Sequence, residues 1–138
     1  MKISQPFDAN VQLLSKVLDL RSRNQQVIAS NIANAETPGY SPAKFTFDDE
    51  LKMAVGNKGE LPLSQSHHAH IPIGPTDISA ISGTITITED QTGIGDENGV
   101  KVDDEMLALS ENQILYEAAA QLLKKKLSMI SYVVSGGQ

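Results

Sequence analysis

The chain has 138 residues, with 17 Asp or Glu, 11 Lys or Arg, and no Cys or Trp. A chain of this length is expected to form one domain, and without Cys it cannot form disulfides, cysteine–zinc sites or cysteine nucleophiles. The net charge of −6 is concentrated in residues 48–105, which carry −9, and this acidic centre argues against a nucleic-acid-binding surface.

Residues 7–35 have the apolar spacing of one long helix. Apolar side chains recur in three- and four-residue steps, which is typical of a coiled-coil seam. Pro6 or Asp8 suits the start of this helix. The first residues lack the roughly 7–15-residue apolar region of a cleavable secretory signal, and no stretch approaches the ~18 consecutive apolar residues of a membrane span. We predict that the seam consists of Val11, Leu14, Leu18 and Ile28.

The end of this helix carries the most distinctive segment of the chain. Asn31 and Asn34 lie three residues apart and therefore share a helix face, where their amides can bond backbone carbonyls or a neighbouring chain. Pro38 and Gly39 predict a tight turn, in which Gly39 would take a backbone conformation that favours glycine. The alternative is that both Asn residues are merely solvated at a helix end. The residues that we predict to form an assembly signature are Asn31, Ile32, Asn34, Thr37, Pro38, Gly39 and Tyr40.

The middle of the chain has a different texture, with short elements separated by turns. Residues 44–48 alternate like a short strand, and Asp48 is placed to cap a short helix that ends at Gly56. Residues 84–88 (Thr-Ile-Thr-Ile-Thr) have the β-branched, period-two pattern of a second strand. Composition predicts loops or disorder in the remaining stretches, residues 56–82 and 89–99.

Residues 106–134 repeat the helical seam without a break. The acidic residues at positions 103–105 favour a helix start, because negative charge is stabilised at a helix N-terminus. Gly136 and Gly137 favour the end of the helix. At ~1.5 Å per residue this helix would be about 43 Å long. The predicted seam consists of Met106, Leu109, Gln113, Tyr116, Leu123, Leu127 and Ile130.

These patterns predict a mainly α fold, in which the long terminal helices pair as a coiled-coil-like hairpin around a small irregular or β insert. Residues 1–39 and 103–138 would form a helical assembly domain, and residues 40–102 a small acidic insert that is partly disordered. Pairing leaves apolar flanks uncovered, and a helix that is apolar on several sides is usually buried on several sides. We expect other subunits to cover these flanks, which are Leu13, Val17 and Leu20 on the first helix and Leu115, Ala119, Leu122 and Met129 on the second.

No common catalytic or nucleotide-binding motif is present. The cluster with metal-ligand character is His67, His68 and His70. Adjacent His side chains point apart on an extended backbone, and a catalytic zinc site needs fixed geometry and supporting partners. We therefore expect no metal, no cofactor and no enzymatic activity, and keep a small metal-dependent enzyme that uses these three His residues as an alternative.

Residues 29–35 (Ala-Ser-Asn-Ile-Ala-Asn-Ala), followed by residues 37–40 (Thr-Pro-Gly-Tyr), resemble the signature of the bacterial flagellar axial proteins, which build rods, hooks and hook-associated structures. Within that family the chain is most similar to the rod protein nearest the base. The supporting similarity extends along the chain, in residues 48–55, 66–68, 71–72, 98–99, 102–103 and 107–126.

The resemblance implies a structural subunit of the proximal rod of the flagellar basal body, polymerising into the drive shaft that transmits torque. It also implies passage through the flagellar type III export apparatus without a cleaved signal peptide, and assembly in the periplasmic space without membrane insertion. The implied neighbours are FliE at the rod base, the rod proteins FlgC, FlgF and FlgG, and further copies of the chain. A cytoplasmic flagellar export chaperone or adaptor, which would share the helical seams, is a further alternative.

Overall fold

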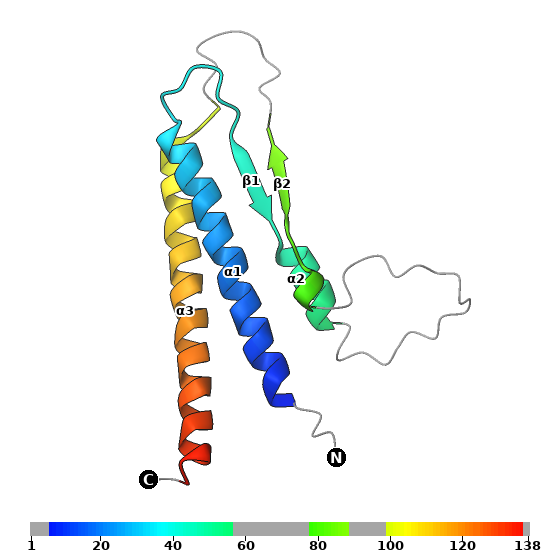
Figure 1. Ribbon diagram of the computed structural model, residues 1–138. Helices are drawn as coiled ribbons and strands as arrows, with labels where there is room; N and C mark the ends of the chain where they lie inside the picture. Colours follow the sequence, from blue (N-terminus) through cyan, green and yellow to red (C-terminus); the bar gives the residue numbers. More distant parts are fainter. Residues whose placement is uncertain (1–5, 57–77, 89–98, 137–138) are drawn as a thin grey trace, which may run out of the picture.

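The computed structural model describes residues 6–56, 78–88 and 99–136. Their elements are α1 (Pro6–Ala33), β1 (Ala43–Thr46), α2 (Asp48–Gly56), the short 3-10 helix η1 (Ile78–Ala80), β2 (Thr84–Ile87) and α3 (Val102–Val134). α1 and α3 pack as an antiparallel pair, and β1 and β2 lie on the other side of α1 (Figure 1). α1 is therefore the central layer. The predicted mainly α fold with paired terminal helices is confirmed.

α1 ends two residues earlier than the sequence pattern predicts, at Ala33. The carbonyl of Ser30 accepts a bond from the backbone N–H of Asn34 at 3.1 Å and another from its side-chain Nδ2 at 2.8 Å. An Asn side chain that bonds nearby backbone competes with continuation of a helix. The chain then turns at Pro38 and Gly39 and returns along α1 as β1 (Figure 1).

β1 and β2 form an antiparallel two-stranded sheet in which Ala43 lies opposite Ile87. Along β1 the buried Phe45 is flanked by exposed residues, as a period-two strand with one covered face requires. α2 follows β1 directly, and its first turn carries three acidic residues that suit the positive end of a helix. Both strands and α2 lie where the sequence predicts them.

The hydrophobic core lies between α1 and the insert rather than between the two long helices. Its buried members are Leu20, Phe45, Phe47, Ala54, Ile78 and Ile81, with Leu13, Val27 and Leu51 packed against them. This arrangement corrects the expectation that other subunits cover Leu13 and Leu20, because the insert covers them within the chain. The rings of Phe45 and Phe47, whose centroids are 5.5 Å apart, supply the large apolar area that covers this side of α1.

α3 packs on α1 through a face that is offset by one residue from the predicted seam at one of its two alternating positions and keeps the other. Its buried residues are Asn112 and Ala119, whereas Gln113 is exposed, because the amide of Asn112 bonds α1. Of the predicted α3 seam, Leu109, Leu123 and Ile130 are half-buried, and Met106, Gln113, Tyr116 and Leu127 are exposed. Of the predicted α1 seam, Ile28 is buried, and Val11, Leu14 and Leu18 are half-buried.

Candidate assembly site

Asn31, near the end of α1, is 1% exposed, and its side-chain amide is fully bonded. Nδ2 donates to the carbonyl of Ala43 at 2.7 Å and to Oε1 of Glu105 at 3.1 Å. Oδ1 accepts from the hydroxyl of Tyr40 and from the backbone N–H of Ala43, both at 3.0 Å. These four bonds use the whole capacity of an amide. They join the end of α1 to the turn, to β1 and to α3.

The turn after α1 has the geometry that the sequence predicts. The backbone N–H of Tyr40 donates to the carbonyl of Thr37 at 3.2 Å. Gly39, between them, has a φ of +71°, as the third position of a type II turn requires. This turn brings the Tyr40 hydroxyl back onto Asn31.

The two Asn residues of the predicted signature have different surroundings. All four hydrogen bonds that the Asn31 amide can form are made within the subunit. Its amide therefore has no donor or acceptor left for a neighbouring chain. Asn34 is half-buried, and its Oδ1 accepts from the hydroxyl of Thr37 at 3.3 Å, so it closes the helix end. Of the other signature residues, Ile32 and Tyr40 are half-buried, and Thr37, Pro38 and Gly39 are exposed.

Replacing Gly39 with Val is expected to destabilise the subunit by about 1–2 kcal/mol, the penalty for an L-residue in the left-handed region. A Cβ at this position would meet no atom within 4 Å, so the loss comes from the backbone alone. The measurement is the free energy of unfolding in denaturant. Gly39→Asn is the matched control, because Asn tolerates positive φ better than other residues. Equal stability of the wild-type and Val proteins would contradict the prediction.

A second polar cluster, which the sequence analysis missed, lies within the contact between α1 and α3. Nδ2 of Asn112 donates to the backbone carbonyl of Arg21 at 2.9 Å. Its Oδ1 accepts from Nδ2 of Asn24 at 3.2 Å and from Nη1 of Arg21 at 3.4 Å. The Arg21 guanidinium also lies 3.4 Å from Oδ1 of Asp48 and 5.1 Å from the centre of the Phe47 ring. The sequence signal that could have predicted this cluster is a polar residue, here Asn112, within an otherwise apolar helical seam.

The face of α3 that turns away from α1 carries an apolar surface, which we name the outer stripe. Residues seven apart on a helix lie on one face, and five of its six members have a partner at this spacing. A row of large exposed apolar side chains on a subunit is typical of an interaction site. Among the described helices, none is both long and apolar enough to cross a membrane. The outer stripe consists of Leu107, Ile114, Leu115, Leu122, Met129 and Tyr132, which are between 47% and 67% exposed.

The exposed fractions show which of the apolar flank residues predicted on the second long helix are covered within the subunit. Leu115, Leu122 and Met129 are 47% to 58% exposed, as expected of a flank that the hairpin leaves open, whereas Ala119 is buried. Ala119 belongs instead to the face that packs on α1, where its small side chain is buried and suits a close approach of the two helices. The uncovered apolar surface of the subunit is therefore concentrated on α3.

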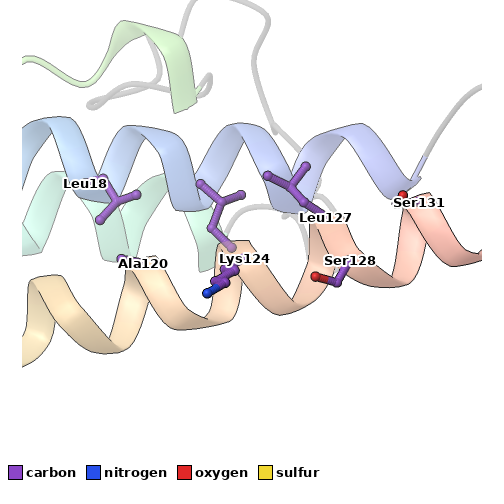
Figure 2. Close-up of a pocket in the computed structure, with 7 residues that line it drawn as sticks. Leu18, Ala120, Lys124, Leu127, Ser128 and Ser131 are labelled. Carbon is purple, nitrogen blue, oxygen red and sulfur yellow. The ribbon is translucent and has the colours of Figure 1, made fainter.

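A shallow groove of roughly 450 Å³ runs between α1 and the second half of α3. Figure 2 shows Leu18 of α1 facing Ala120 across the groove, with Leu127 farther along α3. Lys124 and two serines form its polar rim. The mixed lining and open shape suit contact with another protein surface better than enclosure of a small ligand.

The His residues weighed as metal ligands, His67, His68 and His70, lie outside the described residues. Within the described ranges, no group of three or more His, Asp or Glu residues is arranged to hold a metal ion.

Comparison with known proteins finds similarity over nearly the whole chain. The profile of a family described as "Flagella basal body rod protein" matches residues 18–40. The flagellar basal body rod protein FlgB of Salmonella typhimurium is 32% identical over 137 residues, covering 95% of this chain and 96% of that protein. FlgB of Bacillus subtilis is 30% identical over 132 residues, covering 96% and 98% respectively. FlgB of Escherichia coli is 29% identical over 140 residues, covering 95% and 96%.

Proposed function

Because this chain belongs to the FlgB family of flagellar basal body rod proteins, we infer that it is a structural subunit of the basal body rod. The observation that carries the mechanism is the outer stripe of α3, which leaves a row of large apolar side chains uncovered in the single subunit. Removing such surface from water is favourable by about 25 cal/mol per Å² before the entropic costs of association are subtracted. Polymerisation through the outer stripe would bury it against neighbouring subunits.

We propose that residues 1–39 and 103–138 form the polymerising part and that residues 40–102 brace it. In support, the buried side chains of the insert pack on α1, and α1 in turn packs on α3. A rod that transmits torque needs stiff elements with many buried contacts. It needs no reaction centre, and we propose that the subunit has no catalytic role.

The specific neighbours and the route of export are also proposals. We propose contacts with FliE at the rod base, with the rod proteins FlgC, FlgF and FlgG, and with further copies of this chain. We propose export through the flagellar type III apparatus without a cleaved signal peptide, followed by assembly in the periplasmic space. Membership in a rod protein family supports association with other basal body components.

Replacing Leu122 with Asp is expected to abolish rod assembly and swimming while the subunit stays folded. Leu122 is 58% exposed in the subunit, so the carboxylate is tolerated there. In an assembled interface it would be buried without a partner, at several kcal/mol, and each ~1.4 kcal/mol weakens association tenfold. The measurements are swimming-ring diameter, helix content by circular dichroism, and the amount of subunit in purified basal bodies.

The matched control for this test is Gln121→Asp, which introduces the same charge at the adjacent exposed position outside the outer stripe. It should swim normally. Leu123 is unsuitable for the test because it is half-buried beside α1, where a charge would also disturb the fold of the subunit. Normal swimming of the Leu122→Asp strain would show that the outer stripe is not an interface.

A further inference from the structure

The contact between α1 and α3 contains two polar rungs that are one heptad apart on both helices. In one rung, Nδ2 of Asn31 donates to Oε1 of Glu105 at 3.1 Å. In the other, Nδ2 of Asn24 donates to Oδ1 of Asn112 at 3.2 Å. Asn24 and Asn31 differ by seven positions, as do Glu105 and Asn112. The two bonds are therefore consistent with a single antiparallel register of α3 on α1. Because the seam repeats every seven residues, an alternative register would shift one helix along the other by one heptad.

The next rung in this register is apolar. Continuing by seven residues along each helix pairs Val17 with Ala119. Val17 is half-buried and Ala119 is 6% exposed, so this rung is apolar on both helices and offers no partner to an amide. The polar rungs thus occupy one half of the helix pair, and the apolar seam continues into the other half.

We propose that Asn24 and Asn112 lock α3 in one axial register on α1, as specificity-determining residues rather than as sources of stability. A slip of one heptad in one direction places Asn112 opposite Val17, and a slip in the other places Asn24 opposite Ala119. Either slip separates the two amides and leaves one of them opposite an apolar side chain, the buried Asn112 in the first slip and the half-buried Asn24 in the second. A covered polar group without a partner is disfavoured. An apolar pair at the same positions would pack well in several registers, as occurs when a polar seam residue is removed from coiled coils.

Arg21 connects the Asn24–Asn112 pair to the insert. Its guanidinium donates to Oδ1 of Asn112 from one side and to Oδ1 of Asp48 from the other, both at 3.4 Å. The residue that aligns α3 is thereby connected to the first turn of α2. The register of the hairpin decides where the outer stripe lies relative to the insert. This register is a property of the single subunit and does not depend on what the outer stripe contacts.

The test uses engineered cysteine pairs, since the chain has no Cys of its own. Leu18→Cys with Ala120→Cys reports the observed register, because these residues face each other across the groove (Figure 2). Leu18→Cys with Gln113→Cys reports the slip that places Asn112 opposite Val17. Leu18→Cys with Leu127→Cys reports the slip that places Asn24 opposite Ala119. Each pair is oxidised in dilute full-length chain, and the intramolecular disulfide is quantified by mass spectrometry.

In the wild-type background, the pair for the observed register should dominate. In the double variant Asn24→Leu with Asn112→Leu, we expect the ratio of slipped to observed cross-links to rise at least tenfold, with no fall in the thermal midpoint. Gln121→Leu, at an exposed position of α3, is the matched control and should leave the ratio unchanged. An unchanged ratio in the double variant would overturn the proposal.

If the Asn24→Leu, Asn112→Leu variant fails to fold, a second variant tests the same proposal. Exchanging the polar and apolar positions on α1, by Val17→Asn with Asn24→Val, moves the amide by one heptad. Asn112 then finds its partner only after a slip, and the cross-link between positions 18 and 113 should increase at least tenfold. If position 18 continues to cross-link only with position 120, the amides do not set the register.

Discussion

Replacing Gly83 with Ala is expected to destabilise the subunit by about 2–4 kcal/mol, through overpacking of ~1–3 kcal/mol and ~1 kcal/mol of backbone strain. Gly83 has a φ of +66°, and an added Cβ would lie 2.4 Å and 2.5 Å from two ring atoms of Phe45 and 3.2 Å from Cβ of Phe47. The Phe45 ring is buried in the core and cannot swing into solvent. The backbone N–H of Gly83 also donates to Oε2 of Glu50 at 3.2 Å, which holds the glycine in place.

Two control glycines separate these contributions. Gly39 has a similar φ of +71° but open space around it, so Gly39→Ala measures the backbone strain alone. Gly56 has open space and no positive φ, so Gly56→Ala should be neutral or slightly stabilising. Unfolding in denaturant gives the three free energies. A loss for Gly83→Ala no larger than that for Gly39→Ala would show that the core yields around Phe45.

Replacing Asn31 with Leu should be as damaging, at about 2–5 kcal/mol. The substitution removes the partner of the N–H and carbonyl of Ala43, of the Tyr40 hydroxyl and of the Glu105 carboxylate. Each buried group left without a partner costs about 1–3 kcal/mol, and partial access to water reduces the sum. The turn should loosen from α1, which amide hydrogen exchange at Ala43 would detect.

Asn31→Asp tests the directionality of the same network. The carboxylate still accepts from Tyr40 and from the N–H of Ala43, but it cannot donate to the carbonyl of Ala43 or to Glu105. It also faces Glu105 as a like charge. We expect a loss of stability comparable to that of Asn31→Leu. Asn34→Leu is the control, because its bonds are confined to the helix end, and it should cost under about 1 kcal/mol. Equal losses for the Leu variants of Asn31 and Asn34 would contradict a special role for Asn31.

The elements that local pattern determines were predictable from the sequence. Each of these patterns depends on residues that are close together in the sequence. They are the period-two alternation of β1 and β2, the acidic start of α2, and the apolar seams of α1 and α3. The positive φ of Gly39 was predictable for the same reason, since the preceding Pro favours a turn that requires it.

Contacts between segments far apart in sequence were not predictable in this way. Ile78 and Ile81 lie in a stretch whose composition predicted a loop, yet both are buried in the core. The pattern around Phe45 predicted a strand but not the helix that the ring packs against. On α3, periodicity alone selected Gln113, whereas the hydrogen-bond partners on α1 select Asn112. The candidate site therefore needed the structure, because its polar atoms find their partners across the fold.

The central position of α1 has a consequence for motility genetics. Because α1 is covered by α3 on one side and by the insert on the other (Figure 1), a damaging substitution on its covered sides acts on folding, and the subunit becomes a protease target whose cellular level falls. A damaging substitution in the outer stripe leaves the fold intact and the subunit level normal. Immunoblots of non-motile strains would thus sort mutations by helix, with scarce subunits pointing to α1 and abundant but unassembled subunits pointing to α3.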